Sequence, residues 1–191
     1  MSVVGNKRGF IVDGIIVAVL LLLSWLFLAW NATRRLDFFD MSAFLDAGYR
    51  VYTGQIPYRD FYYTAGPVHL YMHAFFFHML GFTRNAVVAH VFVLSSIVTV
   101  MAYIVARTRF GCCLSIFVAL ATLFSYYGPV SHPWYDQNAW FWILIAVFYL
   151  LLLPEKVSSG AALSAGIVAG ICVALSFLCK SNVGVFGGLA L

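Results

Sequence analysis

The chain has 191 residues, of which 63% are hydrophobic and only 9% are charged. This composition excludes a soluble globular domain and indicates an integral membrane protein with several spans. The formal net charge of +4 comes from scattered basic residues rather than from a run, so no nucleic-acid partner is indicated. The four cysteines have neither a metal-site nor a disulfide-framework spacing, and we expect them to be small core residues.

The first apolar run, residues 11–30, is long enough to cross a bilayer. Lys7 and Arg8 precede it, which places the N-terminus in the cytoplasm under the positive-inside rule. The run lacks a small-residue cleavage site, so we predict a retained span rather than a signal peptide. The first loop, residues 31–84, is therefore expected outside the cytoplasm.

Within this loop, residues 34–67 hold eight of the eighteen charged residues and many aromatic ones, so aqueous chemistry is expected there. Residues 41–52 carry apolar side chains at helical spacing, and Asp46 and Arg50 are spaced to pair on the opposite face. This pattern predicts a helix lying on the membrane surface that ends at Gly54.

The next apolar run, residues 66–81, is too short to cross a bilayer, and we predict a second interfacial helix. If this run does not cross, Arg107, Arg109 and Lys156 lie in the cytoplasm with Lys7 and Arg8; if it crosses, they lie outside. The first arrangement agrees better with the positive-inside rule. His69 and His73 share one face of this helix, and we expect water to satisfy them.

Further spans are predicted over residues 85–106, 112–128, 139–153 and 161–179. Gly166 and Gly170, in the last of these, are spaced to admit a neighbouring helix closely. The final apolar run, residues 183–191, is too short to cross. The predicted fold class is all-α: a polytopic transmembrane helix bundle with about five spans and two interfacial helices. We expect residues 1–191 to be a single membrane-embedded module, the N-terminal part of a longer enzyme.

A set of motifs in the external loop resembles a known family. Asp40 stands seventeen residues before the run PYRDF at 57–61, which is followed by Gly66-Pro67, an aromatic-rich helix and Gly81. The segment KSNVG at 180–184 adds a lysine after an apolar helix. Together they resemble the N-terminal membrane module of GT-C superfamily glycosyltransferases, which include protein O-mannosyltransferases and the aminoarabinose transferases of lipid A.

The resemblance implies an enzyme that moves a sugar from a polyprenyl-phosphate lipid donor to the hydroxyl of an acceptor glycan, lipid or protein. It places the reaction on the outer side of a bacterial plasma membrane. Asp40 takes the position of the family's catalytic acid, which is often an Asp-Glu pair. Here Met41 follows, which leaves one carboxylate and weakens a metal-binding interpretation. No cofactor is certain, and a divalent metal stays an alternative, as does a helix N-cap for Asp40.

A sugar transfer with inversion needs a base for the acceptor hydroxyl and cations for the departing phosphate. Asp40 is the predicted base, and Arg59 and Lys180 are the predicted phosphate-binding residues. Interfacial anchoring is the alternative for both cations. Asp60 is a further candidate for substrate binding, with simple pairing to Arg59 as its alternative. The second external loop contributes two more candidates, His132 and Asp136.

The competing class is a non-catalytic small membrane protein, such as a transporter subunit or a scaffold. A transporter is expected to place ionisable residues inside its spans. We assign only His90 to the interior of a span, so an enzyme is favoured and haem binding by facing histidines is disfavoured.

Overall fold

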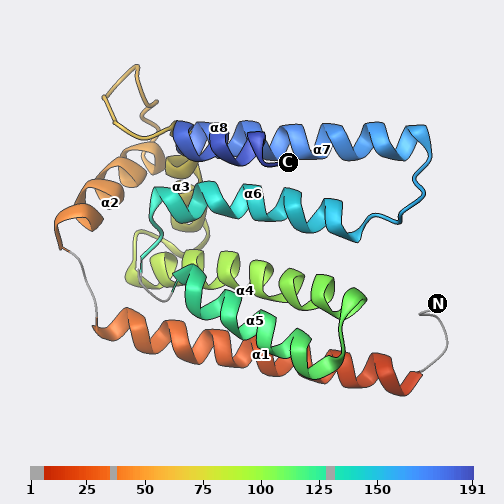
Figure 1. Ribbon diagram of the computed structural model, residues 1–191. Helices are drawn as coiled ribbons and strands as arrows, with labels where there is room; N and C mark the ends of the chain where they lie inside the picture. Colours follow the sequence, from red (N-terminus) through yellow and green to blue (C-terminus); the bar gives the residue numbers. More distant parts are fainter. Residues whose placement is uncertain (1–6, 35–37, 128–131) are drawn as a thin grey trace.

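The computed structural model describes residues 7–34, 38–127 and 132–191, and in these ranges the chain folds into a bundle of helices (Figure 1). One isolated bridge between Pro57 and Phe61 is the only β-pairing in the described ranges. The helices are α1 (Lys7–Arg34), α2 (Phe38–Tyr52), α3 (Pro67–Leu80), α4 (Arg84–Arg109), α5 (Cys112–Tyr127), α6 (Tyr135–Leu152), α7 (Ser159–Cys179) and α8 (Ser181–Leu189).

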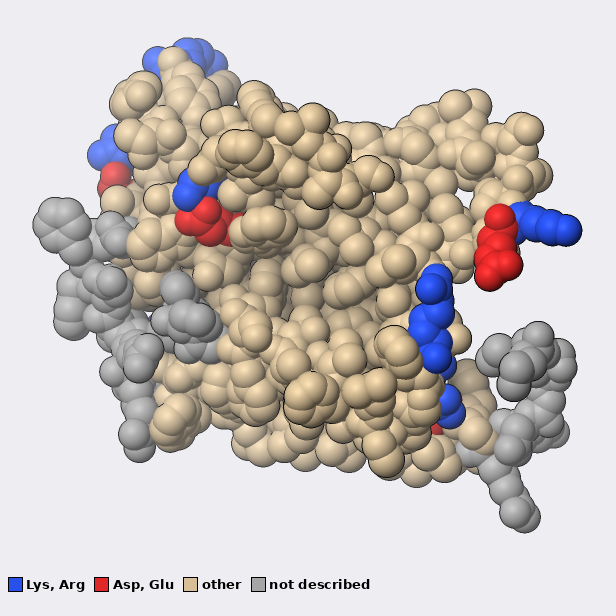
Figure 2. All heavy atoms as spheres, in the orientation of Figure 1, with Lys and Arg blue, Asp and Glu red and all other residues tan. Residues whose placement is uncertain are grey.

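Four described helices, α1, α4, α6 and α7, are long and apolar enough to cross a membrane, and α5 is a shorter apolar helix of 16 residues. Figure 2 shows the charged side chains mainly toward the two ends of the molecule on the face in view, with a wide uncharged surface between them. The predicted all-α membrane bundle is therefore confirmed, with α5 as the shortest of the five predicted spans. The chain is an integral membrane protein.

The bundle has two ends that side-chain contacts define. At the Asp13 end, Arg107 of α4 bonds to Asp13 of α1, and Arg109 donates to the carbonyl of Leu151 in α6. At the opposite end, which we call the Lys180 end, α2 and α3 cover the starts of α4 and α6 (Figure 1). The predicted arrangement, with Arg107 and Arg109 at one end and Lys180 at the other, matches this structure. Which end faces the cytoplasm stays a prediction.

The two helices predicted in the first external loop are present as α2 and α3, and their position on the membrane surface stays a prediction. In α2, Arg50 Nε lies 2.8 Å from Asp46 Oδ2, the predicted ion pair, and Gly54 beyond the helix has a left-handed φ of 95°. The 14 residues of α3 run between caps at Gly66 and Gly81. Such a helix is about 21 Å long, which is less than the roughly 30 Å of a hydrocarbon core.

The core joins helices that are distant in sequence. Buried apolar side chains from α1, α3, α4, α5 and α6 form its largest cluster, which includes Leu28, Phe77, Val91, Leu94, Val98, Tyr127 and Phe141. α2 reaches the bundle through Gly48, where an added Cβ would touch His73 and Phe77 of α3. The predicted apolar stripe of α2 therefore packs against protein.

The predicted close helix approach at Gly166 and Gly170 is wrong for the described structure. No neighbouring atom lies within 4 Å of a Cβ placed at either residue, because this face of α7 points away from the bundle. The close approach occurs instead at α8, where a Cβ on Gly184 would collide with Phe177 and one on Gly187 would crowd Ile143. The small residues of α8 thus allow it to fold back along α7.

The expectation that the cysteines are core residues holds for two of them. Cys172 and Cys179 are buried, whereas Cys112 is half-buried and Cys113 is exposed. All four are free thiols, as their spacing predicted.

Candidate functional site

Lys180 and Asp136 meet at the Lys180 end of the bundle. Lys180 is the single residue between α7 and α8, and Asp136 lies in the first turn of α6, where a negative charge favours the helix N-terminus. Lys180 Nζ donates to Asp136 Oδ1 at 2.5 Å and lies 4.6 Å from the ring centroid of Tyr135. The side chains are 29% and 33% exposed. Two predicted site residues far apart in sequence are thereby brought together.

A polar cavity of about 460 Å³ adjoins this pair, and we call it the Lys180 pocket. Its walls are residues 64–67 and 180–182, together with Tyr58, Phe177 and Leu178. Two helices begin at these walls, α3 at Pro67 and α8 at Ser181. The first amides of a helix have no acceptor within it, and they carry the positive end of its dipole. Both helix starts therefore favour an anion here, whereas the C-terminal end of α7 at Cys179 favours a cation.

Gly66 joins the start of α3 to the end of α7. Its backbone N–H donates to the carbonyl of Cys179 at 3.0 Å, and a Cβ here would collide with the carbonyl of Leu178. Pro67 then occupies the first turn of α3, where its missing N–H costs no helix hydrogen bond. The Gly-Pro pair thus has a physical reason: only glycine permits this contact, and proline begins the helix beside it.

Tyr58 is a wall residue that the sequence analysis did not select. Its φ is 66°, a left-handed conformation that is rare for a bulky side chain. The Tyr58 hydroxyl donates to the backbone carbonyl of Ala65 at 2.5 Å. The Tyr58 backbone N–H donates to the backbone carbonyl of Phe61. Burial raises the pKa of the Tyr58 phenol, so it stays a hydrogen-bond donor. The signal available in the sequence was its place inside the PYRDF run.

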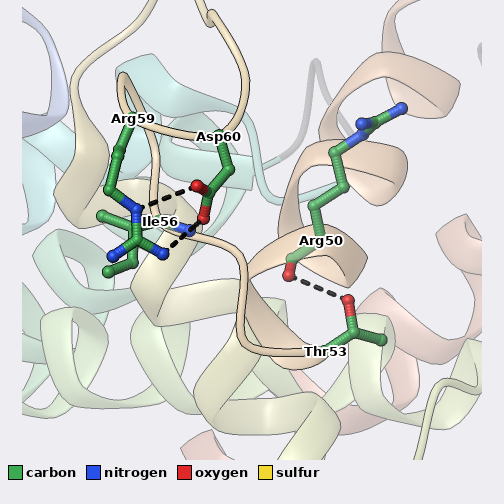
Figure 3. A network of polar contacts seen from close by, with 5 residues as sticks. All are labelled: Arg50, Thr53, Ile56, Arg59 and Asp60. Atoms are coloured by element: carbon green, nitrogen blue, oxygen red, sulfur yellow. Dashed lines mark hydrogen bonds and ion pairs between the residues drawn. The ribbon is translucent and has the colours of Figure 1, made fainter.

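Arg59 and Asp60 bind each other (Figure 3). Arg59 Nε and Nη2 donate to the two carboxylate oxygens of Asp60, each at 2.8 Å, and the amide of Ile56 donates to Oδ2. The guanidinium and this amide lower the pKa of Asp60 to about 2, and the carboxylate raises the pKa of Arg59. The pairing given as the alternative for Asp60 is present. No hydrogen bond or ion pair joins either residue to Lys180 in the described part of the chain.

His132 and Asp136 are not brought together. α6 begins at Tyr135, so His132 precedes the helix and does not share a helical face with Asp136. The ring of His132 is only 4% exposed and lies against Phe44 and Trp134. Asp136 instead binds Lys180.

The expectation that water satisfies His69 and His73 is wrong. They are 0% and 1% exposed, because α2 and the segment before α6 cover their face of α3. The ring of His73 lies 5.2 Å from that of His69 and 4.8 Å from that of His90, centroid to centroid. His73 Nε2 lies 3.1 Å from the carbonyl of Pro133 and donates to it.

The imidazoles of His69 and His73 are neutral at neutral pH. Burial holds the pKa of His69 well below its ordinary value and lowers that of His73 to about 4. Among the described residues, no group of three or more His, Cys, Asp or Glu is arranged to hold a metal ion. The cluster therefore belongs to the core behind the Lys180 pocket.

Asp40, the predicted base, lies in the first turn of α2. The helix begins at Phe38, so Asp40 is inside it rather than at the N-cap position that was its structural alternative. Its side chain lies outside the described part of the structure. The start of α2 is at the Lys180 end of the bundle (Figure 1).

Asp13 is an ionisable residue inside a span that the sequence analysis overlooked, so the assignment of His90 alone was wrong. It lies in α1, and its Oδ1 accepts hydrogen bonds from the hydroxyl of Tyr103 at 2.6 Å and from Arg107 Nε at 3.1 Å. The signal was an acidic residue within an otherwise apolar run.

The fold and the site together define an all-α integral membrane protein with a pocket at one end of its bundle, lined by Lys180 and by the starts of α3 and α8. None of the protein-family models, curated proteins and solved structures that were compared matches this chain.

Proposed function

We propose that the chain is a glycosyltransferase module that takes a sugar from a polyprenyl-phosphate donor and transfers it to an acceptor hydroxyl. One observation carries the proposal: the Lys180 pocket adjoins an apolar groove of about 600 Å³ between α7 and α8, and Phe177 and Leu178 line both. A ligand with an anionic head and a long hydrocarbon tail matches a polar pocket joined to an apolar groove.

The phosphate of such a donor is proposed to bind at Lys180. Lys180 is about three-tenths exposed, so a phosphate can reach Nζ, and the start of α8 offers amide donors beside it. The donor phosphate replaces Asp136 as the partner of Lys180, and the freed carboxylate is exposed enough to be hydrated. The ring of Tyr135 limits where the ammonium group moves, since it packs against Nζ.

In the proposed reaction a carboxylate accepts the proton of the acceptor hydroxyl as its oxygen attacks the anomeric carbon. The bond from that carbon to the phosphate oxygen breaks, and the lipid phosphate leaves with the electron pair. Lys180 and the two helix starts stabilise the charge that develops there. Asp40 is the proposed base from the family resemblance, and Asp136 is the second choice because it lies beside Lys180.

Arg59 is proposed to meet the donor or neighbouring lipid headgroups rather than to line the pocket. Its side chain is 65% exposed and follows Tyr58, which is a wall residue. The proposed location is the bacterial plasma membrane, with the N-terminus in the cytoplasm and the Lys180 pocket on the outer side. This orientation follows from the positive-inside rule.

Binding of undecaprenyl phosphate to the purified chain in detergent tests the proposal. Lys180→Gln removes a charge-assisted contact of about 1.5–3 kcal/mol, so the affinity should fall about tenfold to a hundredfold. Lys156→Gln changes a lysine in the turn between α6 and α7, at the Asp13 end, and should leave the affinity unchanged. Undecaprenol, which lacks the phosphate, should not distinguish parent from Lys180→Gln.

Equal affinity of parent and Lys180→Gln for undecaprenyl phosphate would overturn the proposed site. In that case the non-catalytic alternative, a transporter subunit or a scaffold, becomes the better interpretation.

A further inference from the structure

A second cavity lies at the Asp13 end, in the crevice between α1 and α4. Its volume is about 430 Å³. Asp13, Tyr103, Arg107 and Thr108 supply its polar side chains, and its other walls are apolar, with Val17 of α1 and Ile104 of α4 among them. It belongs to neither the Lys180 pocket nor the groove beside α8.

The charged groups of this crevice are only partly used within the chain. Tyr103 and Arg107 both donate to Oδ1 of Asp13, and in the described ranges Oδ2 receives no hydrogen bond. Arg107 makes its contact through Nε, and within the described part of the chain its Nη donors remain for another anionic group. The side chains of Arg107 and Asp13 are 39% and 33% exposed. A carboxylate acceptor and guanidinium donors thus lie next to each other where an apolar crevice opens.

An ionisable residue within a membrane segment is costly and commonly marks a functional site. Hydrogen bonds from Tyr103 and Arg107 stabilise the charge of Asp13. They do not fill the cavity that lies beside these three residues. Gly14 also lines the crevice. A Cβ added to it would have no neighbouring atom within 4 Å, so this position leaves open space along the crevice.

We propose that this crevice binds a phospholipid with a phosphoethanolamine headgroup. The primary ammonium donates to Asp13, the phosphate accepts from Arg107, and one acyl chain lies along Val17 and Ile104. Phosphatidylglycerol has no cation for Asp13, and the quaternary ammonium of phosphatidylcholine has no N–H to donate. Free phosphate would leave the apolar walls unfilled. Charge complementarity therefore selects the zwitterionic lipid with a primary amine.

Native mass spectrometry of the delipidated chain tests this, with phosphatidylethanolamine, phosphatidylglycerol and phosphatidylcholine added in equal amounts. The parent should retain one phosphatidylethanolamine in preference to the other two. Asp13→Asn and Arg107→Gln should each lower that adduct about tenfold, the effect of losing one charge-assisted hydrogen bond. Arg109→Gln is the matched control, because Arg109 binds the carbonyl of Leu151 instead.

Substitutions at Asp13 or Arg107 also loosen the contact between α1 and α4, so a second variant is needed. Gly14→Leu fills the crevice without removing a charged group and should abolish the adduct while the unfolding temperature stays at or above that of the parent. Gly166→Leu, at an equally open glycine of α7, should keep the adduct. Retention of phosphatidylethanolamine by Gly14→Leu, equal retention of all three lipids, or no adduct on the parent would each overturn the proposal.

Discussion

Acidification from pH 7 to pH 5 should destabilise this protein through His73. The imidazole is buried, and its pKa falls from an ordinary 6.5 to about 4 in the folded chain. Between these values the unfolded chain binds a proton that the folded chain excludes, so stability rises with pH across this window. Stability is complete above about pH 6.5 and is lost as the pH falls towards 4.

The magnitude follows from the two pKa values. The ratio of protonation in the two states gives a loss of about 2 kcal/mol for His73 between pH 7 and pH 5, approaching about 3 kcal/mol below pH 4. His69 acts in the same direction, since burial also lowers its pKa. Asp60 stays ionised across this window because its pKa is about 2.

The assay is reversible unfolding in mixed micelles, followed by tryptophan fluorescence at each pH. His73→Gln keeps a donor for the carbonyl of Pro133 but does not titrate, so its loss of stability from pH 7 to pH 5 should be about 2 kcal/mol smaller than that of the parent. His78→Gln removes an exposed histidine of α3 as a control and should behave as the parent. A parent whose stability is flat from pH 7 to pH 5 would refute the reasoning.

Three further predictions concern packing, topology and chemistry. Gly66→Ala should lower the free energy of unfolding by about 1–3 kcal/mol, because its Cβ meets the carbonyl of Leu178, whereas Gly170→Ala, in open space, should not lower it; equal effects in chemical denaturation would contradict this. A single cysteine at position 109, in a cysteine-free chain, should resist impermeant maleimide in sealed cells, and labelling from outside would reverse the assigned orientation. Asp40→Asn should abolish sugar transfer while membrane insertion and donor binding persist, and transfer within about twofold of the parent would exclude Asp40 as the base.

The helices were predictable because a bilayer sets their length and an apolar run shows it directly. The run at 66–81 differs from α3 by one residue at each end. The run at 139–153 missed the start of α6, since the polar residues Tyr135 and Asp136 open this helix and contact Lys180. Asp13 escaped notice because one acid hardly alters the character of a long apolar run.

The contacts of the site were less predictable, since they depend on which helices are neighbours. Lys180 and Asp136 were each selected, but nothing in the sequence states that the end of α7 meets the start of α6. The burial of His69 and His73 likewise depends on α2 folding over α3. The small residues of α7 suggested close packing, but the close contact is at Gly184, in a segment predicted only as an apolar run.

The most direct test of the account is to map where a photoreactive polyprenyl phosphate attaches to the chain in membranes. The label should be found on residues 177–189, where the polar pocket meets the groove between α7 and α8. Excess undecaprenyl phosphate should compete for that label, and Lys180→Gln should reduce it. Labelling that is spread evenly over the lipid-facing helices, or that undecaprenyl phosphate does not displace, would contradict a polyprenyl-phosphate site at Lys180.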